Sequence, residues 1–464
     1  MPAEALPHIA ARYGMEAIAL TDHDALTGAV RFSKACKEAG VRPIFGAELG
    51  VRSGNTIDHV TLLARDKVGY GNLCHLISDA HLSHERGSPE SSFDAIVQRA
   101  EGLFVLSGCE RGEVARLAAC GDLPGAAAAA QRWRSGIGDG YRLEIFDHRT
   151  YGSRTLRDRL LGIARMSAVT AVATNDVHYA LPEQAVVHEL MHAIHEIVPL
   201  SATHSLRANS EYFLKTGAEV RALFHDAPEV ADESLRIADA CDFDLDLGTY
   251  HFPNFPIPTG ETPTSFLARR CFDGAARRYR LVTKDIEDRL QHELNLIFRM
   301  GFAAYFVLVA DIVDHVRAMG IRCSCRGSAA GSLVCYVLGI SDVDPVRYDL
   351  LFERFMNERR DELPDIDVDV ESARREDVLT YILQTYGSDQ TAVCCMVDTF
   401  RARMAIREVG KALGLPPEEI DVVAKAFPRV AARNIPDAIE RLPELAGSNL
   451  RAGQLEQLFE LCLA

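Results

Sequence analysis

Three acidic residues alternate with aliphatic residues in the segment 364–369, which reads Pro-Asp-Ile-Asp-Val-Asp. In an extended strand successive side chains point to opposite faces, so Asp365, Asp367 and Asp369 are predicted to share one face. Carboxylates that lie side by side repel one another and lose solvation on burial, and a divalent cation relieves both costs. Because hard oxygen ligands suit Mg²⁺, the pattern indicates a magnesium site. The alternative is a strand with a solvated acidic face at a sheet edge.

A second segment, further upstream, has the composition of a phosphate-binding loop. Arg326, Gly327 and Ser328 are followed by further small residues and then by the apolar stretch 333–338. Small residues at a helix start leave backbone N–H groups available to an anion, and the helix dipole favours negative charge there. Arg326 would add a guanidinium group for phosphate oxygens. The alternative is a tight turn before a helix, but a phosphate cradle combined with an acidic strand is what metal-assisted phosphoryl transfer needs.

A third group of residues accompanies the short aliphatic runs that alternate with helical stretches in the first 245 residues. This alternation is typical of an α/β barrel or a layered α/β domain. Side chains suited to metal binding stand at the ends of these runs, mostly the C-terminal ends, namely His23, Glu48, His59, Cys109, Asp176 and His178. Parallel barrels build their active sites there, and imidazole, carboxylate and thiolate ligands suit Zn, Mn or Fe. One such residue alone is more often structural, but six at successive strands indicate a metal centre.

The composition is that of a globular chain of 464 residues, enough for two or three domains that each bury a core. The formal net charge of −16 excludes a uniformly basic surface, so contact with DNA must come from local arginine clusters. The twelve cysteines include no Cys-x-x-Cys pair, which favours reduced thiols in a cytoplasmic protein. The sequence has no signal peptide and no apolar run of membrane length, so no membrane partner is expected.

The acidic strand and the phosphate loop belong to a longer ordered pattern. Its other members are Gly301-Phe302, Tyr305-Phe306, Asp311-Ile312, Gly331-Ser332, Asp344-Pro345 and Leu351-Phe352-Glu353-Arg354-Phe355. The whole pattern closely resembles the palm of the bacterial DNA polymerase III α subunit, a nucleotidyltransferase domain of the polymerase β type. The resemblance implies that Asp365 and Asp367 are two of three catalytic Mg²⁺ ligands. It also implies that Gly327 and Ser328 contact the incoming triphosphate, with Arg326 and Arg354 as further nucleotide contacts.

The first region resembles the polymerase and histidinol phosphatase (PHP) domain, which opens the same α subunits. That family has a distorted α/β barrel with a clustered metal site, and some members proofread as 3′→5′ exonucleases. The resemblance places the six metal-type residues above on the ligand motifs of a Zn²⁺ or Mn²⁺ centre. The sequence departs from the family at its start, where the strand that carries His-x-His before the Thr-Asp-His motif (residues 21–23) is missing. The departure predicts an exposed strand edge and an incomplete metal site.

The last region resembles the start of the family's thumb, and helices are expected over 399–413, 416–426 and 455–462. By this resemblance the DNA backbone is contacted by basic side chains there, namely Arg401, Arg403, Arg407 and Lys411. The alternative is an amphipathic helix with a solvated basic face. The predicted fold class is therefore α/β, with a PHP domain over 1–245, a palm with its linker over 246–395 and a helical thumb over 396–464.

Two functions from different classes follow. The first is a DNA-directed DNA polymerase α-type subunit, which transfers nucleotides from dNTPs to the 3′-OH of primer–template DNA during replication or damage-tolerant synthesis. The family's third catalytic acid, its fingers and its contacts with a sliding clamp and other replisome or mutasome subunits are expected beyond Ala464, so full activity is not expected of this chain alone. Residues 73–82 and 395–401 favour the accessory, error-prone copies of the enzyme. The second function is an inactive or hydrolytic remnant, which binds DNA or a polymerase partner or acts as a PHP phosphoesterase.

Overall fold

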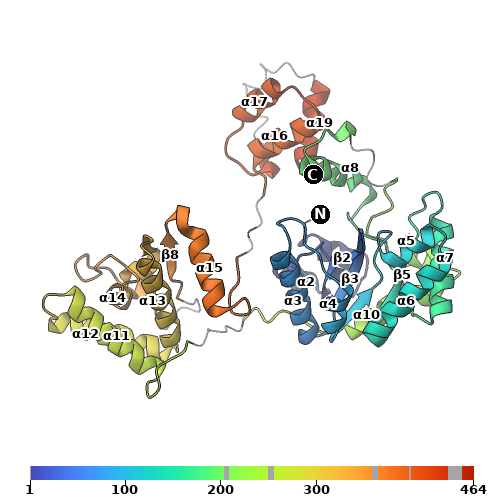
Figure 1. The fold of residues 1–464 in the computed structure, drawn as a ribbon. Helices are drawn as coiled ribbons and strands as arrows, with labels where there is room; N and C mark the ends of the chain where they lie inside the picture. The colour runs from blue at the N-terminus through green and yellow to red at the C-terminus, as the bar shows by residue number, and fades with distance from the viewer. Residues whose placement is uncertain are drawn as a thin grey trace. The chain divides into compact units, whose positions relative to one another are not determined.

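The structure of the chain is a computed structural model (Figure 1), which describes residues 2–202, 208–248, 255–357, 364–394, 396, 399–436 and 452–463. The chain divides into two compact units. The first unit contains Met1–Asp246 together with Met396–Ala464, and the second contains Leu247–Cys395. The C-terminal helices therefore belong to the same compact unit as the N-terminal region.

A six-stranded sheet organises the first unit. Its strands lie in the order β1 to β6, with bounds Ala17–Leu20, Arg42–Ser53, Thr56–Ala64, Leu103–Leu106, Tyr141–Ile145 and Ala171–Ala173. The β1–β2, β4–β5 and β5–β6 pairs are parallel, whereas β2–β3 and β3–β4 are antiparallel. The predicted distorted α/β barrel is confirmed as a curled sheet of mixed direction, with β1 and β6 at its two edges.

The strands that carry Glu48 and His59 are longer than their aliphatic runs. β2 and β3 form a hairpin in which Ser53 pairs with Thr56, and Gly54 takes a φ of 60° in the two-residue turn. Glu48 therefore lies inside β2 and His59 inside β3, and the prediction that these two side chains stand at strand ends is wrong. The physical reason is that backbone pairing across a tight turn continues through polar residues, which an aliphatic pattern does not reveal.

Helices cover the sheet, and Figure 1 shows α6 and α7 beside β5. The helices before the linker are α1 Leu6–Arg12, α2 Ala29–Ala39, α3 Lys67–Ser83, α4 Phe93–Gln98, α5 Glu113–Ala119, α6 Leu123–Ile137, α7 Ser153–Ser167, α8 Ala185–Glu196, α9 Gly217–Leu223 and α10 Pro228–Ala240. Several begin at side-chain caps, as the carboxylate of Asp66 accepts a hydrogen bond from the Gly69 N–H at the start of α3. Such a cap satisfies an N–H group that the helix itself leaves unpaired.

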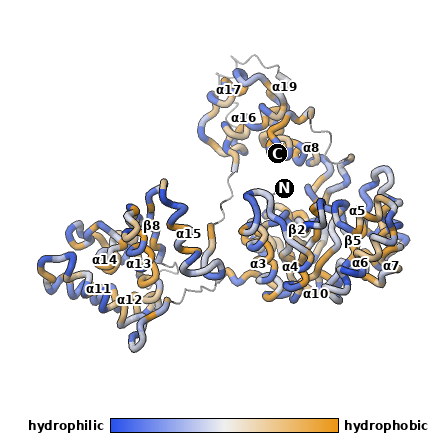
Figure 2. Tube along the Cα trace, in the orientation of Figure 1, coloured by the Kyte–Doolittle hydropathy of each residue, from blue (hydrophilic) through white to orange (hydrophobic). Residues whose placement is uncertain are grey.

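The main hydrophobic core of this unit lies between the sheet and the helices. Leu62 of β3, Val105 of β4 and Leu143 of β5 are fully buried in it. The single tryptophan, Trp133 of α6, packs its ring against Phe93 of α4 at a centroid distance of 4.7 Å. Figure 2 shows apolar stretches along α6 and α7. Burial of this apolar surface holds the strands, and thus the side chains at their ends, in fixed positions.

The C-terminal helices pack on α8. These helices are α16 Ala402–Ala412, α17 Pro417–Ala426 and α19 Ala452–Leu463. Leu190 and Ala193 of α8 share one hydrophobic cluster with Ile406 of α16, Phe427 and Leu458. The buried face of α8 is therefore fixed by the C-terminal segment.

The second unit is built from helices around a short two-stranded ribbon. Its elements are α11 Pro263–Arg278, α12 Lys284–Arg299, α13 Ala303–Ala318, β7 Cys323–Arg326, η4 Gly327–Gly331, α14 Leu333–Val337, η5 Phe352–Arg354, β8 Asp367–Val370 and α15 Arg375–Tyr386. The strands β7 and β8 are antiparallel, and Arg326 pairs directly with Asp367 in their register. Leu294 of α12 and Phe306 of α13 are fully buried in the core beside the ribbon.

Within the described residues, no single helix is long and apolar enough to cross a membrane. The bent pair α12 and α13, which meet at 114°, passes the criteria of length and composition only when the two helices are taken together. Both helices contribute buried side chains to the core of the second unit.

Candidate metal centre and nucleotide site

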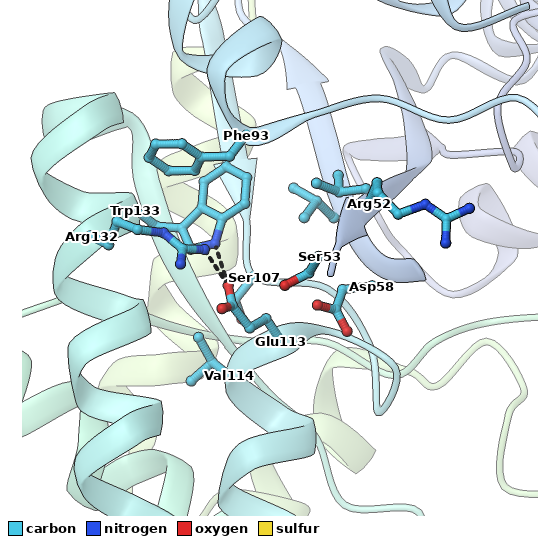
Figure 3. Close-up of a pocket in the computed structure, with 11 residues that line it drawn as sticks. Arg52, Ser53, Asp58, Phe93, Ser107, Glu113, Val114, Arg132 and Trp133 are labelled. Carbon is cyan, nitrogen blue, oxygen red and sulfur yellow. Dashed lines mark hydrogen bonds and ion pairs between the residues drawn. The ribbon is translucent and has the colours of Figure 1, made fainter. Parts of the chain in front are cut away.

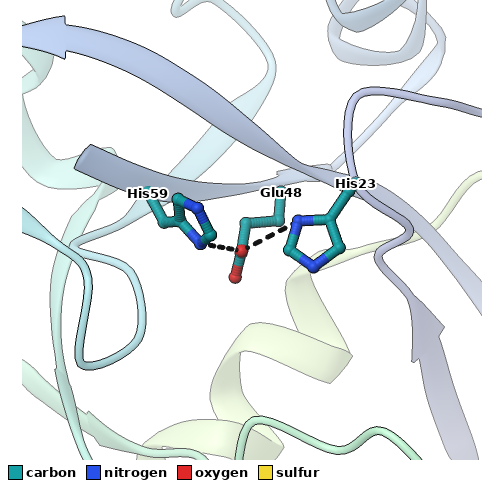
Figure 4. Close-up of side chains that lie close together, drawn as sticks. All are labelled: His23, Glu48 and His59. Atoms are coloured by element: carbon teal, nitrogen blue, oxygen red, sulfur yellow. Dashed lines mark ion pairs between the residues drawn. The ribbon is translucent and has the colours of Figure 1, made fainter. Parts of the chain in front are cut away.

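Two histidine side chains of the first unit converge on the carboxylate of Glu48 (Figure 4). His23 Nδ1 lies 3.1 Å from Glu48 Oε1, and His59 Nδ1 contacts the same oxygen. The turn after β1 is tied to β2 by its backbone, since the Asp24 N–H donates to the Glu48 carbonyl and the Glu48 N–H donates to the Asp22 carbonyl. These two hydrogen bonds place His23 next to Glu48, and the β2–β3 hairpin places His59 beside them.

Cys109 and Asp176 join the same carboxylate from two other strand ends. The ligand atoms of Glu48, Cys109 and Asp176 all lie within 4.8 Å of one another, and Cys109 Sγ is 3.5 Å from His59 Nδ1. Cys109 follows β4 through Gly108, which has a φ of 86°, and a Cβ atom there would collide with the His59 carbonyl oxygen. Only glycine permits this close approach.

His178 stands at the border of this group. Its Nε2 atom lies 3.1 Å from Asp176 Oδ1, and its ring stacks on that of His23 at a centroid distance of 6.4 Å. The structure thus gathers five of the six predicted ligands into two overlapping groups and holds the sixth against them. Imidazole, carboxylate and thiol groups at these separations fit a divalent transition metal ion, and would hold it through nitrogen, oxygen and sulfur.

The electrostatics of the centre favour a cation. Burial alone would raise the pKa of Glu48, but hydrogen bonds with His23 and His59 outweigh burial and lower the pKa well below its usual range. The hydrogen bond to Glu48 in turn raises the pKa of His23. Burial, reinforced by Glu48 and Asp176, raises the pKa of the Cys109 thiol. Such a thiol becomes a ligand only when a metal ion displaces its proton.

Strand β5 and the polar groups on it and just beyond it were not predicted from the sequence. Glu144 of β5 is buried and accepts a hydrogen bond from Thr174, and burial raises its pKa to about 7. His148, just beyond β5, is fully buried, with Nδ1 at 2.9 Å from Glu110 Oε1 and Nε2 at 3.2 Å from the Asn175 carbonyl oxygen. The aliphatic residues of β5 followed by Asp147 and His148 are the sequence signal that would have revealed them.

The acidic strand of the second unit lies opposite the predicted phosphate loop. Arg326 Nη1 is 3.1 Å from Asp367 Oδ2, and Arg326 Nε donates to Asp369 Oδ1 at 3.2 Å. Ile366 is buried while its acidic neighbours are partly or fully exposed, as alternation predicts. Asp365 precedes β8 rather than lying within it, and the Ile366 N–H donates to the Tyr305 hydroxyl at 3.2 Å. Tyr305 thereby positions the chain between the two predicted ligands.

The phosphate loop differs from the helix start that the sequence suggested. Gly327, with a φ of 72°, opens the single 3₁₀ turn η4, and α14 is only five residues long. The first N–H groups of α14 are already engaged, because Leu333 and Val334 donate to Glu293 at 3.0 and 3.1 Å. A buried carboxylate therefore occupies the position that an anion at this helix start would take. A triphosphate would have to be met by Gly327 and Ser328 in η4.

Comparison with known proteins identifies both regions. Residues 1–148 match the PHP domain, and residues 265–464 match the bacterial DNA polymerase III alpha NTPase domain. An error-prone DNA polymerase of Symbiobacterium thermophilum is 39% identical to the chain, over 97% of this chain and 43% of that protein. An error-prone DNA polymerase of Mycobacterium tuberculosis is 36% identical over 95% of this chain and 41% of that protein. The DNA polymerase III subunit alpha of Bacillus subtilis is 33% identical over 99% of this chain and 41% of that protein.

The chain belongs to the bacterial DNA polymerase III α family. It spans about two fifths of the length of these curated relatives, whose alignments cover 43% and 41% of their own sequences. Its PHP domain agrees with the metal-type groups gathered around Glu48.

The remaining predicted site residues of this polymerase III α-family chain occupy less specific positions. Arg354 ends the short 3₁₀ turn η5 and is exposed. Three of the four cations predicted to contact DNA hold partners within the chain. Arg403 donates to the Phe427 carbonyl, Arg407 pairs with Asp421, and Lys411 pairs with Glu408. Arg401, just before α16, is exposed and forms a backbone bridge with Ala431.

An enclosed cavity of about 30 Å³ lies elsewhere in the PHP region (Figure 3). Glu113 is held in its wall by Arg132 at 2.6 Å and by the Trp133 indole N–H at 3.2 Å. A space of this size holds a single water molecule. The cavity is therefore a packing feature and too small for a substrate.

Proposed function

We propose that the chain is part of a DNA-directed DNA polymerase, with the palm of polymerase β type in its second unit. The observation that carries this proposal is the β7–β8 ribbon, where Asp367 and Asp369 stand beside Arg326 and the Gly327–Ser328 turn. Acids for a metal and small residues for a phosphate thus meet at one end of a two-stranded ribbon. The family membership supports the same chemistry.

In this proposal Asp365 and Asp367 hold Mg²⁺, and Gly327 and Ser328 bind the triphosphate of a dNTP. When bound, two such ions lower the pKa of the primer 3′-OH and stabilise the leaving pyrophosphate. Arg326 lies where the acids and the phosphate loop meet, so its guanidinium group balances the acids and contacts phosphate oxygens. Arg354 is a further nucleotide contact, and Arg401, which is exposed just before α16, is a proposed DNA contact.

The PHP centre supports a second activity, metal-dependent phosphoester hydrolysis. The proposal rests on the overlapping groups His23–Glu48–His59 and Glu48–Cys109–Asp176, completed by His178, as a Zn²⁺ or Mn²⁺ site. Removal of a mismatched 3′ nucleotide is one such reaction. It is tested by release of 3′ nucleotides from single-stranded DNA, which should require Zn²⁺ or Mn²⁺ and disappear in Glu48→Gln.

The proposed partners are primer–template DNA, a sliding clamp and other replisome or mutasome subunits, in the cytoplasm. The error-prone relatives are 39% and 36% identical to the chain, and the main α subunits are 34% and 33% identical. This order favours the accessory, damage-tolerant class of the enzyme.

Primer extension by the full-length gene product tests the polymerase proposal. Asp367→Asn is expected to reduce extension at least about a hundredfold, because one metal ligand is lost, while the affinity for DNA stays within about twofold. Asp377→Asn on α15 is the matched control, since this exposed carboxylate pairs only with nearby Arg374 among the described contacts. Extension that survives in Asp367→Asn would remove this carboxylate from the proposed metal site.

A further inference from the structure

Helix α8 carries a row of three histidines. His188, His192 and His195 recur at i, i+4 and i+7, so they lie on one face of the helix. Leu190 and Ala193 lie on the opposite face and are buried against the C-terminal helices. That packing fixes the rotation of α8, and the histidine face must point away from the C-terminal helices.

The first histidine of this row reaches the metal centre. The ring of His188 lies 4.7 Å from that of His178, with an angle of 51° between the ring planes, and 6.0 Å from the ring of Tyr179. His195, by contrast, exposes 83% of its side chain. Four imidazole rings thus form a chain from His59 through His23 and His178 to His188, with centroid distances of 5.3, 6.4 and 4.7 Å.

The ring distances agree with shared metal ions. A metal–nitrogen bond of about 2.0–2.1 Å places each ring centroid about 3.2 Å from the ion, so two rings on one ion at angles of 90–110° are separated by about 4.5–5.2 Å. The His178–His188 distance of 4.7 Å falls in this interval, and the His23–His59 distance of 5.3 Å lies just above it. The His23–His178 distance of 6.4 Å exceeds it.

We propose that His188 is a further metal ligand of the PHP centre, and that His178 and His188 hold an ion distinct from the one beside His23, Glu48 and His59. Asp176, whose Oδ1 lies 3.1 Å from His178 Nε2, is the carboxylate of the same subsite. Two imidazoles and one carboxylate suit Zn²⁺ and other divalent transition ions. This inference rests on the metal site of the proposed function and extends it from the sheet onto α8.

Helix α8 thereby links the metal centre to the C-terminal segment. One face of the helix supplies His188, and the other contacts α16 through Leu190 and Ala193. A metal ion at His188 would consequently fix α8, and the binding of that ion would stabilise the packing against α16.

The test is the affinity of the full-length gene product for Zn²⁺, measured by competition with a chromogenic chelator and by elemental analysis of dialysed protein. His188→Ala is expected to weaken binding of one Zn²⁺ ion at least about tenfold, because a direct ligand is removed. His178→Ala is the positive control and is expected to lose the same ion. His192→Ala is the matched control, one turn further along the same face, and should keep its affinity within about twofold.

Each outcome decides a separate question. Wild-type affinity in His188→Ala overturns the proposal, and so does an equal loss in His192→Ala, which would place the ion along α8 instead of at the PHP centre. Failure of the wild-type protein to bind any Zn²⁺ overturns the proposed metal site itself. Should His188→Ala unfold α8, as shown by hydrogen exchange, His188→Gln keeps a polar side chain of similar size and must show the same loss. Replacement of Zn²⁺ by Co²⁺ adds a visible spectrum, which must change in His188→Ala and persist in His192→Ala.

Discussion

Glu293 is the buried group that holds the proposed phosphate loop in place, and its removal has a calculable effect. Its carboxylate accepts hydrogen bonds from the Leu333 and Val334 N–H groups at 3.0 and 3.1 Å and from the Ser332 hydroxyl at 2.9 Å. Arg289 Nε donates to the same carboxylate at 3.2 Å and reaches the carbonyl oxygens of Gly331 and Leu350 through Nη2. Glu293 itself is fully buried. This carboxylate thus connects α12 to the start of α14, next to η4.

The substitution Glu293→Ala leaves two buried N–H groups, the Ser332 hydroxyl and one cation without this acceptor. An unpaired buried donor costs about 1–3 kcal/mol, and loss of one partner of a buried ion pair costs about 3–5 kcal/mol. Arg289 keeps its bonds to the two carbonyl oxygens and is partly exposed, so the net cost is about 3–4 kcal/mol. Since about 1.4 kcal/mol corresponds to a factor of ten, local opening should become about 150- to 700-fold more frequent.

Hydrogen exchange of the backbone amides in residues 329–338 measures this opening in the intact chain. In the wild type each carboxylate oxygen of Glu293 accepts one backbone N–H group, whereas the side chain of Glu293→Gln has only one acceptor oxygen. An intermediate cost of about 2 kcal/mol is therefore expected for Glu293→Gln. Asp288→Ala is the control, because Asp288 is exposed on the same helix, and its exchange should match the wild type. Unchanged protection in Glu293→Ala would refute the role of this carboxylate in fixing the loop.

Two further predictions concern the PHP centre. Gly108→Ala should destabilise the protein by more than about 3 kcal/mol and reduce bound metal, because both the positive φ and the collision with the His59 carbonyl oppose a Cβ. Gly121 has a φ of 85° but open space around it, so the control Gly121→Ala should cost only about 1–2 kcal/mol. Thermal unfolding measures both losses of stability. Burial raises the pKa of Glu144 to about 7, so folding favours its protonated form. The contribution of this carboxyl group to the stability of metal-free protein is therefore fully present below the unfolded pKa. It is lost as the pH rises toward 7. In the wild-type protein the decline in stability between about pH 4.5 and 7 should amount to about 3 kcal/mol, and metal-free Glu144→Gln should lack it in thermal unfolding. An identical pH profile in the wild type and in Glu144→Gln would contradict the raised pKa of Glu144.

The sequence predicted local features well because their causes are local. Strand β1 and the position of His23 after it follow from an aliphatic run and its end. The alternation of Asp367 and Asp369 with apolar residues follows from the pleat of a strand. The hairpin between β2 and β3 was harder to predict, because its backbone pairing continues through polar residues around Gly54. Glu48 and His59 consequently lie within strands and not at their ends.

The contacts that the sequence did not reveal join residues far apart in the chain. Arg326 was predicted to meet phosphate, yet its pairing with Asp367 depends on the antiparallel register of two strands separated by the whole of α14 and η5. Glu293 likewise carries no local sign that it accepts hydrogen bonds from Leu333 and Val334. Periodicity describes one element at a time and cannot specify such pairs.

Helix α8 shows how these two kinds of information combine into a functional argument. The helical period alone separates a histidine face from an apolar face, and this much can be read from residues 188–195. Only the tertiary structure shows that the apolar face packs on α16 and that His188 meets His178. If packing on α16 orients His188, then Ala193→Asp, which places a charge in that buried interface, should weaken Zn²⁺ binding without altering any ligand. A variant that loses the α8–α16 packing in hydrogen exchange but binds Zn²⁺ with wild-type affinity would show that the metal centre is independent of the C-terminal segment.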